Sequence, residues 1–205
     1  IDGENWADLC CGTGDLSFLI FKKVRPNGSV TGIDSAKEIL HIAMERSKLI
    51  GNKFISWEMK DILEIDENSK NYDGICMSYG LRNLVNVEEG LKKVFNLLSD
   101  KGRAGFVMAS SATDAAVSEK LIRQQLLETG DVEAIVSISN NFFYTRSLPC
   151  HVWFLNKKKK DKDSILMIDA RNTFRKVNNT INDFSPDQLQ GITTIIKSYR
   201  GEQVN

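Results

Sequence analysis

The amino-acid sequence predicts an α/β fold, a doubly wound and mostly parallel sheet of about seven strands with an antiparallel edge. Apolar runs of strand length alternate with longer segments whose apolar residues recur at helical spacing. The early runs are apolar at most positions, as in strands that helices cover on both faces. From Glu133 onward the strand candidates follow one another with little helix between them, which favours antiparallel pairing at one edge.

Each element has its own local pattern. The strand candidates are eight short apolar runs: Asn5–Cys10, Ser29–Ile33, Phe54–Glu58, Gly74–Ser78, Arg103–Ala109, Glu133–Ser139, Val152–Lys157 and Ile165–Asp169. Helices are predicted where apolar residues repeat at three and four positions: Leu16–Val24, Ile39–Leu49, Leu91–Leu98 and Leu121–Leu127. In the second helix the expected apolar face holds Ile39, Ile42, Ala43 and Leu49.

Turn and cap residues divide these elements. Asp100–Gly102 predicts a turn ahead of the fifth strand. Ser185 and Pro186 are typical of a helix start, because serine can cap the first turn and proline suits its first position. The sequence therefore predicts a last helix near its C-terminal end.

Composition narrows the classes of protein. The 205 residues carry 27 basic and 27 acidic side chains, and the formal net charge of zero argues against non-specific phosphate binding as the main task. No stretch approaches the roughly 20 apolar residues that a membrane-spanning helix needs. The four cysteines lack the spacing of a metal site and fit reduced side chains in a cytoplasmic protein.

The most informative segment is Asp8–Leu16, in which an apolar strand runs into a glycine turn and a helix follows. Gly12 and Gly14 let the backbone approach a ligand closely, and the helix start offers free N–H groups. A dinucleotide-binding fingerprint would carry a third glycine where Ser17 stands, and a P-loop would continue with Gly-Lys-Ser/Thr. Neither continuation is present.

Carboxylates accompany this turn. Asp8 and Asp15 flank it, Asp34 ends the second strand candidate, and Asp61 follows the third. Because ligands bind at the carboxyl ends of such strands, Asp8, Asp34 and Asp61 are expected to line one cleft. These charges would repel phosphate but suit S-adenosylmethionine, which carries a sulfonium and an ammonium group. Asp34 could then accept the ribose hydroxyls and Asp61 the adenine amino group; a purely structural corner is the alternative.

This constellation resembles the cofactor motifs of class I S-adenosylmethionine-dependent methyltransferases, which have a Rossmann-like sheet. Asp8–Asp15 and Ser78–Asn83 are similar to the UbiE/MenG family, the C-methyltransferases of ubiquinone, menaquinone and phylloquinone synthesis, and most of all to its demethylphylloquinone branch. This resemblance covers about residues 1–106. It implies cofactor contacts from ten residues: Asp8, Cys10, Gly12, Thr13, Gly14, Asp34, Ser35, Asp61, Ile62 and Ser78.

Tyr79 and Arg82 are the candidates for catalytic contact with the methyl acceptor, because they follow the fourth strand next to the cofactor edge. A fold-stabilising ion pair is the alternative role for Arg82.

The second part of the chain resembles another family. Phe106–Ala109, Asn141–Thr145, Trp153–Leu155 and Ile165–Arg171 are similar to the modification subunit of type I restriction systems, an adenine-N6 DNA methyltransferase. This resemblance covers about residues 102–205, so a fusion is inferred near Gly102–Phe106. The expected organisation is one methyltransferase domain, with residues 1–106 as the cofactor half and 107–205 as a half of different origin.

Three functions follow from the two resemblances. The first is methylation of a quinone ring. The second is N6-methylation of adenine in DNA, which the sequence disfavours because Ser78–Leu81 stands where an Asn/Asp-Pro-Pro-Tyr/Phe motif is needed. The third is a cofactor-binding domain without turnover. The implied partner is a small quinone or DNA, and the implied location is the cytoplasm, with a peripheral membrane position as an alternative.

Overall fold

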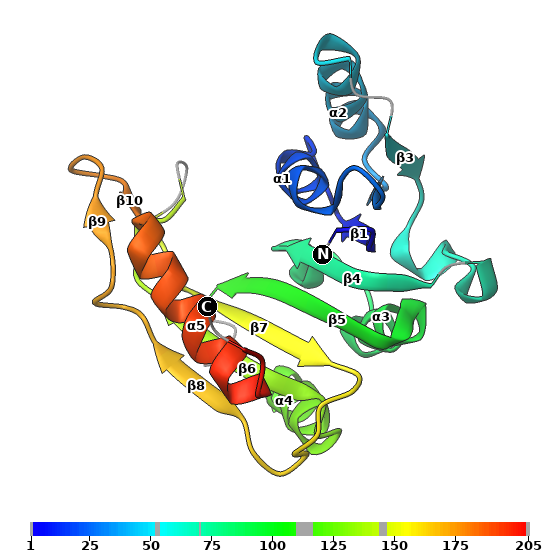
Figure 1. The fold of residues 1–205 in the computed structure, drawn as a ribbon. Helices are drawn as coiled ribbons and strands as arrows, with labels where there is room; N and C mark the ends of the chain where they lie inside the picture. The colour runs from blue at the N-terminus through cyan, green and yellow to red at the C-terminus, as the bar shows by residue number, and fades with distance from the viewer. Residues whose placement is uncertain (1, 52–53, 70, 110–116, 144–146, 204–205) are drawn as a thin grey trace. The chain divides into compact units, whose positions relative to one another are not determined.

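A computed structural model describes residues 2–51, 54–69, 71–109, 117–143 and 147–203 (Figure 1). The chain divides into two compact units. The N-terminal unit comprises residues 1–106 with Asn156–Lys158, and the C-terminal unit comprises residues 107–155 and 159–205. Tyr144 and Thr145, which belong to the second resemblance, lie outside the described residues.

The strands of the N-terminal unit lie in the order β3-β2-β1-β4-β5. Their bounds are Asn5–Leu9 for β1, Ser29–Asp34 for β2, Ile55–Met59 for β3, Tyr72–Ser78 for β4 and Leu98–Ala109 for β5. β1 pairs in parallel with both β2 and β4, and β2 pairs in parallel with β3. The carboxyl ends of these four strands therefore share one edge. The predicted α/β class with a mostly parallel sheet is confirmed.

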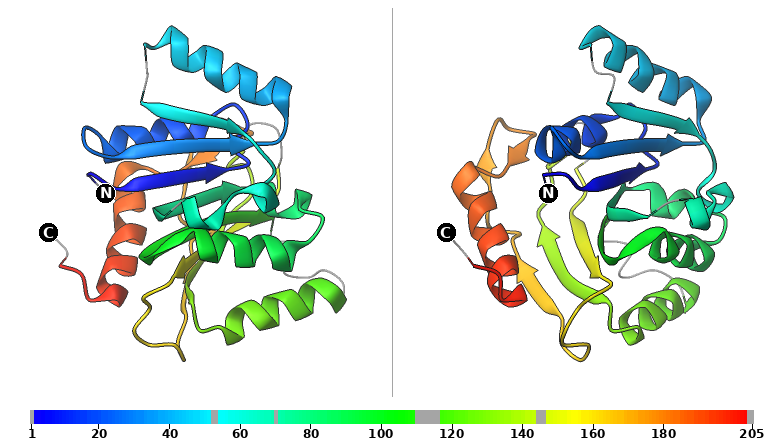
Figure 2. Two further views of the ribbon diagram at one scale, coloured as in Figure 1. Left: turned by 90° about the vertical axis from the view of Figure 1, so that its right-hand side faces the viewer. Right: turned by 45° about the vertical axis from the view of Figure 1, so that its right-hand side comes forward.

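Helices connect these parallel strands: α1 (Asp15–Val24), α2 (Lys37–Leu49) and α3 (Val87–Leu97). Because crossover connections are right-handed, the direction in which the chain moves along the sheet decides which face the connecting helix covers. The chain moves from β1 to β2 in one direction and from β4 to β5 in the other. Figure 2 accordingly shows α1 and α3 on opposite sides of the strands. Three short 3-10 turns follow the strands, η1 (Ile62–Glu64), η2 (Glu67–Ser69) and η3 (Gly80–Asn83). The core between α1 and the sheet holds Val24, Val30 and Ile55, with Phe18 and Trp57 packed against them.

The predicted apolar face of α2 is wrong for three of its four residues, and only Ala43 among them is buried. Ile39, Ile42 and Leu49 are exposed, whereas the buried side chains are Leu40, Ala43 and Ser47. Both sets have helical spacing, and α2 carries apolar residues around much of its circumference. The sequence pattern therefore could not show that the buried face is the one that contains Ser47.

The predicted turn at Asp100–Gly102 is also wrong, because β5 begins at Leu98, directly after α3. Leu98 is buried, and the Gly102 carbonyl accepts a hydrogen bond from the Lys157 amide at 3.1 Å. A side chain at Gly102 would lie 2.9 Å from the Tyr72 carbonyl oxygen, so the glycine here permits a close approach of β4 rather than a turn.

In the C-terminal unit, β6 (Val132–Ile138) pairs antiparallel with β7 (Cys150–Asn156) and parallel with β8 (Leu166–Asp169). The remaining elements are α4 (Val117–Glu128), the β9–β10 hairpin (Arg175–Lys176, Asn182–Asp183) and α5 (Pro186–Arg200). The antiparallel pairing expected after Glu133 thus holds for β6 and β7 but not for β8.

Helix α5 is fixed at its start and on its inner face. The Ser185 hydroxyl accepts from the Gln188 amide, and the Gln188 side chain accepts from the Ser185 amide, which is a capping box. Ile192 and Ile196 pack on the strands of this unit, and Arg200 donates to the buried Glu133 carboxylate at 2.9 Å. Among the described residues, no helix is long and apolar enough to cross a membrane.

Candidate cofactor site

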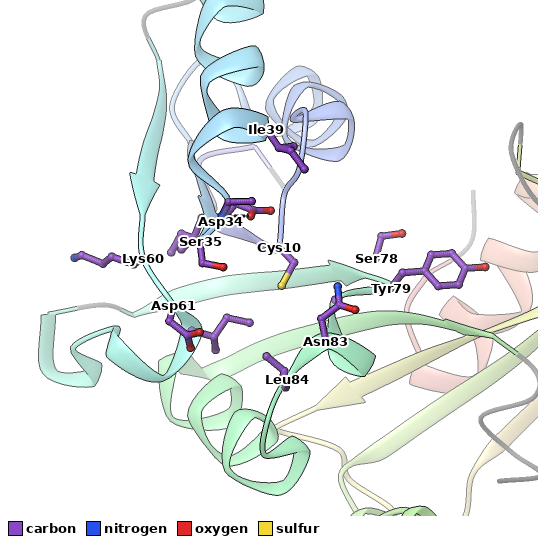
Figure 3. A pocket seen from close by; sticks show the side chains of 14 residues that line it. Cys10, Asp34, Ser35, Ile39, Lys60, Asp61, Ser78, Tyr79, Asn83 and Leu84 are labelled. Atoms are coloured by element: carbon purple, nitrogen blue, oxygen red, sulfur yellow. Dashed lines mark hydrogen bonds between the residues drawn. The ribbon is translucent and has the colours of Figure 1, made fainter.

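A cavity of about 270 Å³ opens at the carboxyl edge of the N-terminal strands (Figure 3). It is lined by residues that follow β1, β2, β3 and β4: Cys10, Ile33, Asp34, Ser35, Ala36, Ile39, Lys60, Asp61, Ile62, Ser78, Tyr79, Gly80, Asn83 and Leu84. Its volume is close to the lower limit of about 300 Å³ for small-molecule sites. Seven of the twelve predicted site residues line it: Cys10, Asp34, Ser35, Asp61, Ile62, Ser78 and Tyr79.

Asp34, the last residue of β2, organises the strand ends. One carboxylate oxygen accepts from the Gly12 amide at 2.8 Å and the other accepts from the Ala36 amide at 2.8 Å. Each carboxylate oxygen can accept more than one hydrogen bond, so these two contacts leave acceptor capacity toward the cavity. Asp34 therefore both orders the glycine turn and presents a carboxylate to a ligand.

Asp61 follows β3 and lines the same cavity, where it caps the start of η1. Its side chain accepts from the Leu63 amide at 2.9 Å, which fixes the carboxylate at the start of this turn. The next residue, Ile62, is buried and gives the same wall an apolar surface. A carboxylate beside a flat apolar surface suits a ring that carries an amino group.

The cavity is electronegative. Burial raises the pKa of the Cys10 thiol to about 11, and the nearby carboxylates of Asp34 and Asp61 act in the same direction. Because the thiol remains neutral at physiological pH, it does not add to or cancel this charge. Lys60 lines the same cavity, but its ammonium group pairs with Glu58 at 3.2 Å and points away from the other side chains in Figure 3.

Asp8 does not line the cavity, although the sequence placed it there. Its side chain is buried under the glycine turn, where one oxygen accepts from the Ser17 hydroxyl at 2.6 Å and the other accepts from the Cys76 thiol at 3.3 Å. Burial raises the pKa of Asp8 to about 6, despite the opposing effect of these hydrogen bonds. Asp8 therefore joins β1, α1 and β4 from below the turn.

The glycine turn takes the left-handed conformations that its glycines allow. Gly12 has φ +56° and Gly14 has φ +83°, and a side chain at Gly14 would lie 2.5 Å from the Trp57 ring. Cys10 adopts φ +53°, so its thiol points into the cavity rather than along the strand. Gly12, Thr13 and Gly14 shape this turn but are not among the lining residues.

Arg46 of α2 holds the outer side of the turn, and no pattern in the sequence indicated this. Its guanidinium donates to the Thr13 carbonyl at 2.6 Å and pairs with the Asp15 carboxylate at 2.8 Å. Asp15 also accepts from the Thr13 hydroxyl at 3.2 Å. The Asp15 charge is thus balanced by Arg46, and the negative charge of the cavity comes from Asp34 and Asp61.

The segment after β4 forms the wall opposite α2. Tyr79 has φ +58°, and the Arg82 guanidinium lies 5.3 Å from the centre of the Tyr79 ring. In Figure 3 the Tyr79 ring points away from Cys10 and Asp34, while the Asn83 amide points toward Cys10. Arg82 is exposed and does not line the cavity.

Some lining residues were missed by the sequence reasoning. Ile39 and Leu84 give the cavity apolar contacts, and Asn83 gives it an amide. The Ser78–Asn83 motif already contained Asn83, so the motif was the available signal. Ile39 was instead expected in the buried face of α2, and nothing in the sequence separates a rim position from a core position on that helix.

Two family models match overlapping parts of the chain. The ubiE/COQ5 methyltransferase family matches residues 1–122, and the N-6 DNA Methylase family matches residues 91–204. Each match covers more than half of the chain. Their overlap contains the Gly102–Phe106 segment at which the sequence predicts the fusion.

Curated relatives match the first part. The 2-phytyl-1,4-naphtoquinone methyltransferase of Thermosynechococcus vestitus is 37% identical over 117 residues, which are 57% of this chain and 51% of that protein. The demethylmenaquinone methyltransferase of Lactobacillus johnsonii is 30% identical over 118 residues, which are 56% and 48% of the two chains. The chain therefore spans about half the length of these relatives.

Solved structures show the same fold. The type I restriction-modification methyltransferase subunit of Streptococcus thermophilus has a TM-score of 0.81 at 20% identity, over 100% of this chain and 49% of that chain. The modification subunit of a type I restriction enzyme from Vibrio vulnificus has a TM-score of 0.67 at 14% identity, over 99% and 50%. The chain thus belongs to two families, to the ubiE/COQ5 methyltransferases through residues 1–122 and to the N-6 DNA methylases through residues 91–204.

Proposed function

We propose that the cavity of the N-terminal unit binds S-adenosylmethionine. The observation that carries this proposal is the pair of carboxylates, Asp34 and Asp61, that line one cavity at the carboxyl ends of the neighbouring parallel strands β2 and β3. In this arrangement Asp34 accepts hydrogen bonds from the ribose hydroxyls. Asp61 accepts one from the adenine amino group, and Ile62 covers a face of the base.

The chemistry of the cavity fits this group. Its net negative charge suits a ligand with a sulfonium and an ammonium group. The Cys10 thiol lines the cavity as a neutral group, so it adds no further charge beside the ligand. Ser35 and Ser78 add hydroxyl groups to the lining. When bound, the cofactor supplies an electrophilic methyl group.

We further propose that the acceptor is a carbon of a quinone-type ring. The support is the identity of residues in the first part to naphthoquinone and demethylmenaquinone methyltransferases. Transfer to carbon would need the reduced, hydroquinone form of the ring with one oxygen ionised. The ring carbon would then form its bond to the methyl group as the methyl–sulfur bond breaks, and release its proton. Tyr79 and Arg82 are the side chains proposed to hold that ring, because a guanidinium stays charged and stabilises an ionised oxygen.

A second candidate is N6-methylation of adenine in DNA. The observation in its favour is the match of residues 91–204 to the N-6 DNA methylases. Against it, Ser78–Leu81 carries neither the Asn/Asp nor the prolines that would hold a target amine. A cofactor-binding protein without turnover is the third candidate. The chain combines the cofactor half of one family with the C-terminal half of another, so neither family's acceptor-binding half is joined to its own cofactor half. That residues 1–205 act as one domain, in the cytoplasm or at a membrane surface, stays a prediction.

Transfer of a labelled methyl group from S-adenosylmethionine separates these candidates. We expect label in a demethylated naphthoquinone that is kept in its reduced, hydroquinone form by an added reductant, and none in unmethylated DNA. Arg82→Gln should slow the transfer about tenfold or more while cofactor affinity stays unchanged, because Arg82 acts on the acceptor. Arg171→Gln, an exposed arginine of the C-terminal unit, is the control. Label in DNA alone would support the second candidate, and cofactor binding without any transfer would support the third.

A further inference from the structure

Arg46 of α2 makes polar contacts with the glycine turn. Its guanidinium donates to the Thr13 carbonyl at 2.6 Å, pairs with Asp15 at 2.8 Å and lies 5.1 Å from the centre of the Phe18 ring. These three partners belong to the turn and to the first residues of α1. Arg46 itself is not a lining residue of the cavity.

The turn has a conformational freedom that these contacts remove. Thr13 lies between Gly12 and Gly14, both at positive φ, and a peptide group between two glycines can rotate at little steric cost. From the cavity side, Asp34 holds the Gly12 amide at 2.8 Å. From the outer side, Arg46 holds the Thr13 carbonyl. The two contacts fix the peptide groups on either side of the Gly12–Thr13 peptide.

We propose that Arg46 is a positioning residue for cofactor binding. By holding the Thr13 carbonyl on the outer side of the turn, it keeps an unfavourable carbonyl dipole out of the cavity and keeps the Gly12 amide on Asp34. By pairing with Asp15, it also secures the start of α1. This inference rests on the proposed function, because it concerns the affinity of the same cavity for S-adenosylmethionine.

An arginine suits this task better than a lysine. The planar guanidinium presents several N–H groups at fixed angles, so it can serve a carbonyl and a carboxylate together while its face lies near the Phe18 ring. A lysine at the same position would keep the charge for Asp15 but lose this fixed geometry. Arg46→Lys should therefore restore part of the function that Arg46→Gln removes.

The test uses the whole chain and S-adenosylhomocysteine as the probe. We expect Arg46→Gln to raise the dissociation constant about tenfold and Arg46→Lys to raise it about threefold, because charge-assisted hydrogen bonds are lost wholly or in part. Lys48→Gln is the matched control on the same helix, since Lys48 pairs with the exposed Glu45 and should leave binding unchanged. The thermal midpoints of the two glutamine variants should be similar.

Amide hydrogen exchange in the free protein gives a readout that does not need the ligand. The amides of residues 12–15 should exchange faster in Arg46→Gln than in the unchanged chain, while the amides of β1 and β2 keep their protection. Unchanged exchange in the turn, or unchanged affinity in Arg46→Gln, would overturn the inference and leave the proposed function standing. Failure of the unchanged chain to bind S-adenosylhomocysteine would overturn both.

Discussion

Asp34 is the single residue on which the candidate site depends most, because it touches both the glycine turn and the cavity. Asp34→Asn removes the charge and leaves one carbonyl oxygen for two backbone amides. We expect cofactor binding to weaken by about 1–3 kcal/mol through lost charge-assisted hydrogen bonds. Asp66→Asn is the matched control, because Asp66 also accepts from an amide two residues on, Asn68, but lies outside the cavity. Calorimetry that gives equal affinities for Asp34→Asn and the unchanged chain would remove the ribose assignment.

Asp8 gives stability a pH dependence of unusual sign. Burial raises its pKa in the folded chain from 3.8 to about 6. Between these two values the folded chain holds a proton that the unfolded chain has released. The free energy of unfolding therefore falls as pH rises through this window, and the loss is complete above about pH 6.

Asp8→Asn removes this proton equilibrium. Relative to the unchanged chain, the variant should gain about 1 kcal/mol of unfolding free energy between about pH 5 and about pH 7. Urea unfolding at both values measures the difference, and Asp163→Asn, on an exposed turn, is the control. A gain of the opposite sign would mean that Asp8 is stabilised as a carboxylate.

The sequence predicts the chemistry of the site better than its geometry. Strand ends and glycines are local signals, so the positions of Asp34, Asp61 and the turn could be predicted. Burial of Asp8 depends on Ser17 and Cys76, which reach it from two other elements. The contact of Arg46 with Thr13 spans 33 residues and has no local pattern. Such long-range contacts become visible only in the folded chain.

At the scale of elements, Lys157 anchors the segment Asn156–Lys158, which belongs to the N-terminal unit although it lies about 50 residues after the rest of that unit in the sequence. Its ammonium donates to the carbonyls of Phe95 and Leu98, at 3.0 and 2.9 Å, where α3 ends and β5 begins. The same ammonium lies 4.6 Å from the centre of the Phe95 ring. The carbonyls at a helix end carry partial negative charge, so a lysine there stabilises the helix.

Lys157→Ala should therefore lower the free energy of unfolding by about 1–3 kcal/mol, because two partly buried carbonyls lose a charged donor. Lys157 begins a run of four lysines, Lys157–Lys160. Lys160→Ala removes an exposed lysine of this run and should change stability by less than about 0.5 kcal/mol. Denaturant unfolding of both variants gives the comparison. Equal stabilities would show that Lys157 is replaceable by water at the end of α3.

The elements themselves could largely be predicted, and the exceptions have a physical reason. Strand–helix alternation located β1 to β4 and α1 to α3, because each apolar run had one period. The start of β5 could not be predicted, since Asp100 and Lys101 are typical turn residues and only the tight approach of Gly102 to β4 continues the strand. In the lysine run, Lys157 and Lys159 bond to carbonyls rather than to solvent, which composition alone does not reveal.

At the scale of the whole chain, two methyltransferase families meet. The cofactor cavity is built entirely from residues 10–84, within the ubiE/COQ5 match, and the N-6 DNA methylase match begins at residue 91. The proposed acceptor contacts, Tyr79 and Arg82, also lie within the ubiE/COQ5 match and before the start of the N-6 DNA methylase match. The residues proposed to hold cofactor and acceptor therefore share one family origin.

The measurement that tests the account most directly is a calorimetric titration of the whole chain with S-adenosylmethionine. One binding site per chain is expected, with an affinity that Asp34→Asn and Asp61→Asn each reduce and Asp66→Asn leaves unchanged. A millimolar dissociation constant corresponds to a binding free energy of about −4 kcal/mol. If no binding is detected up to about millimolar ligand, the result would contradict the central claim that this electronegative cavity holds a cationic nucleoside.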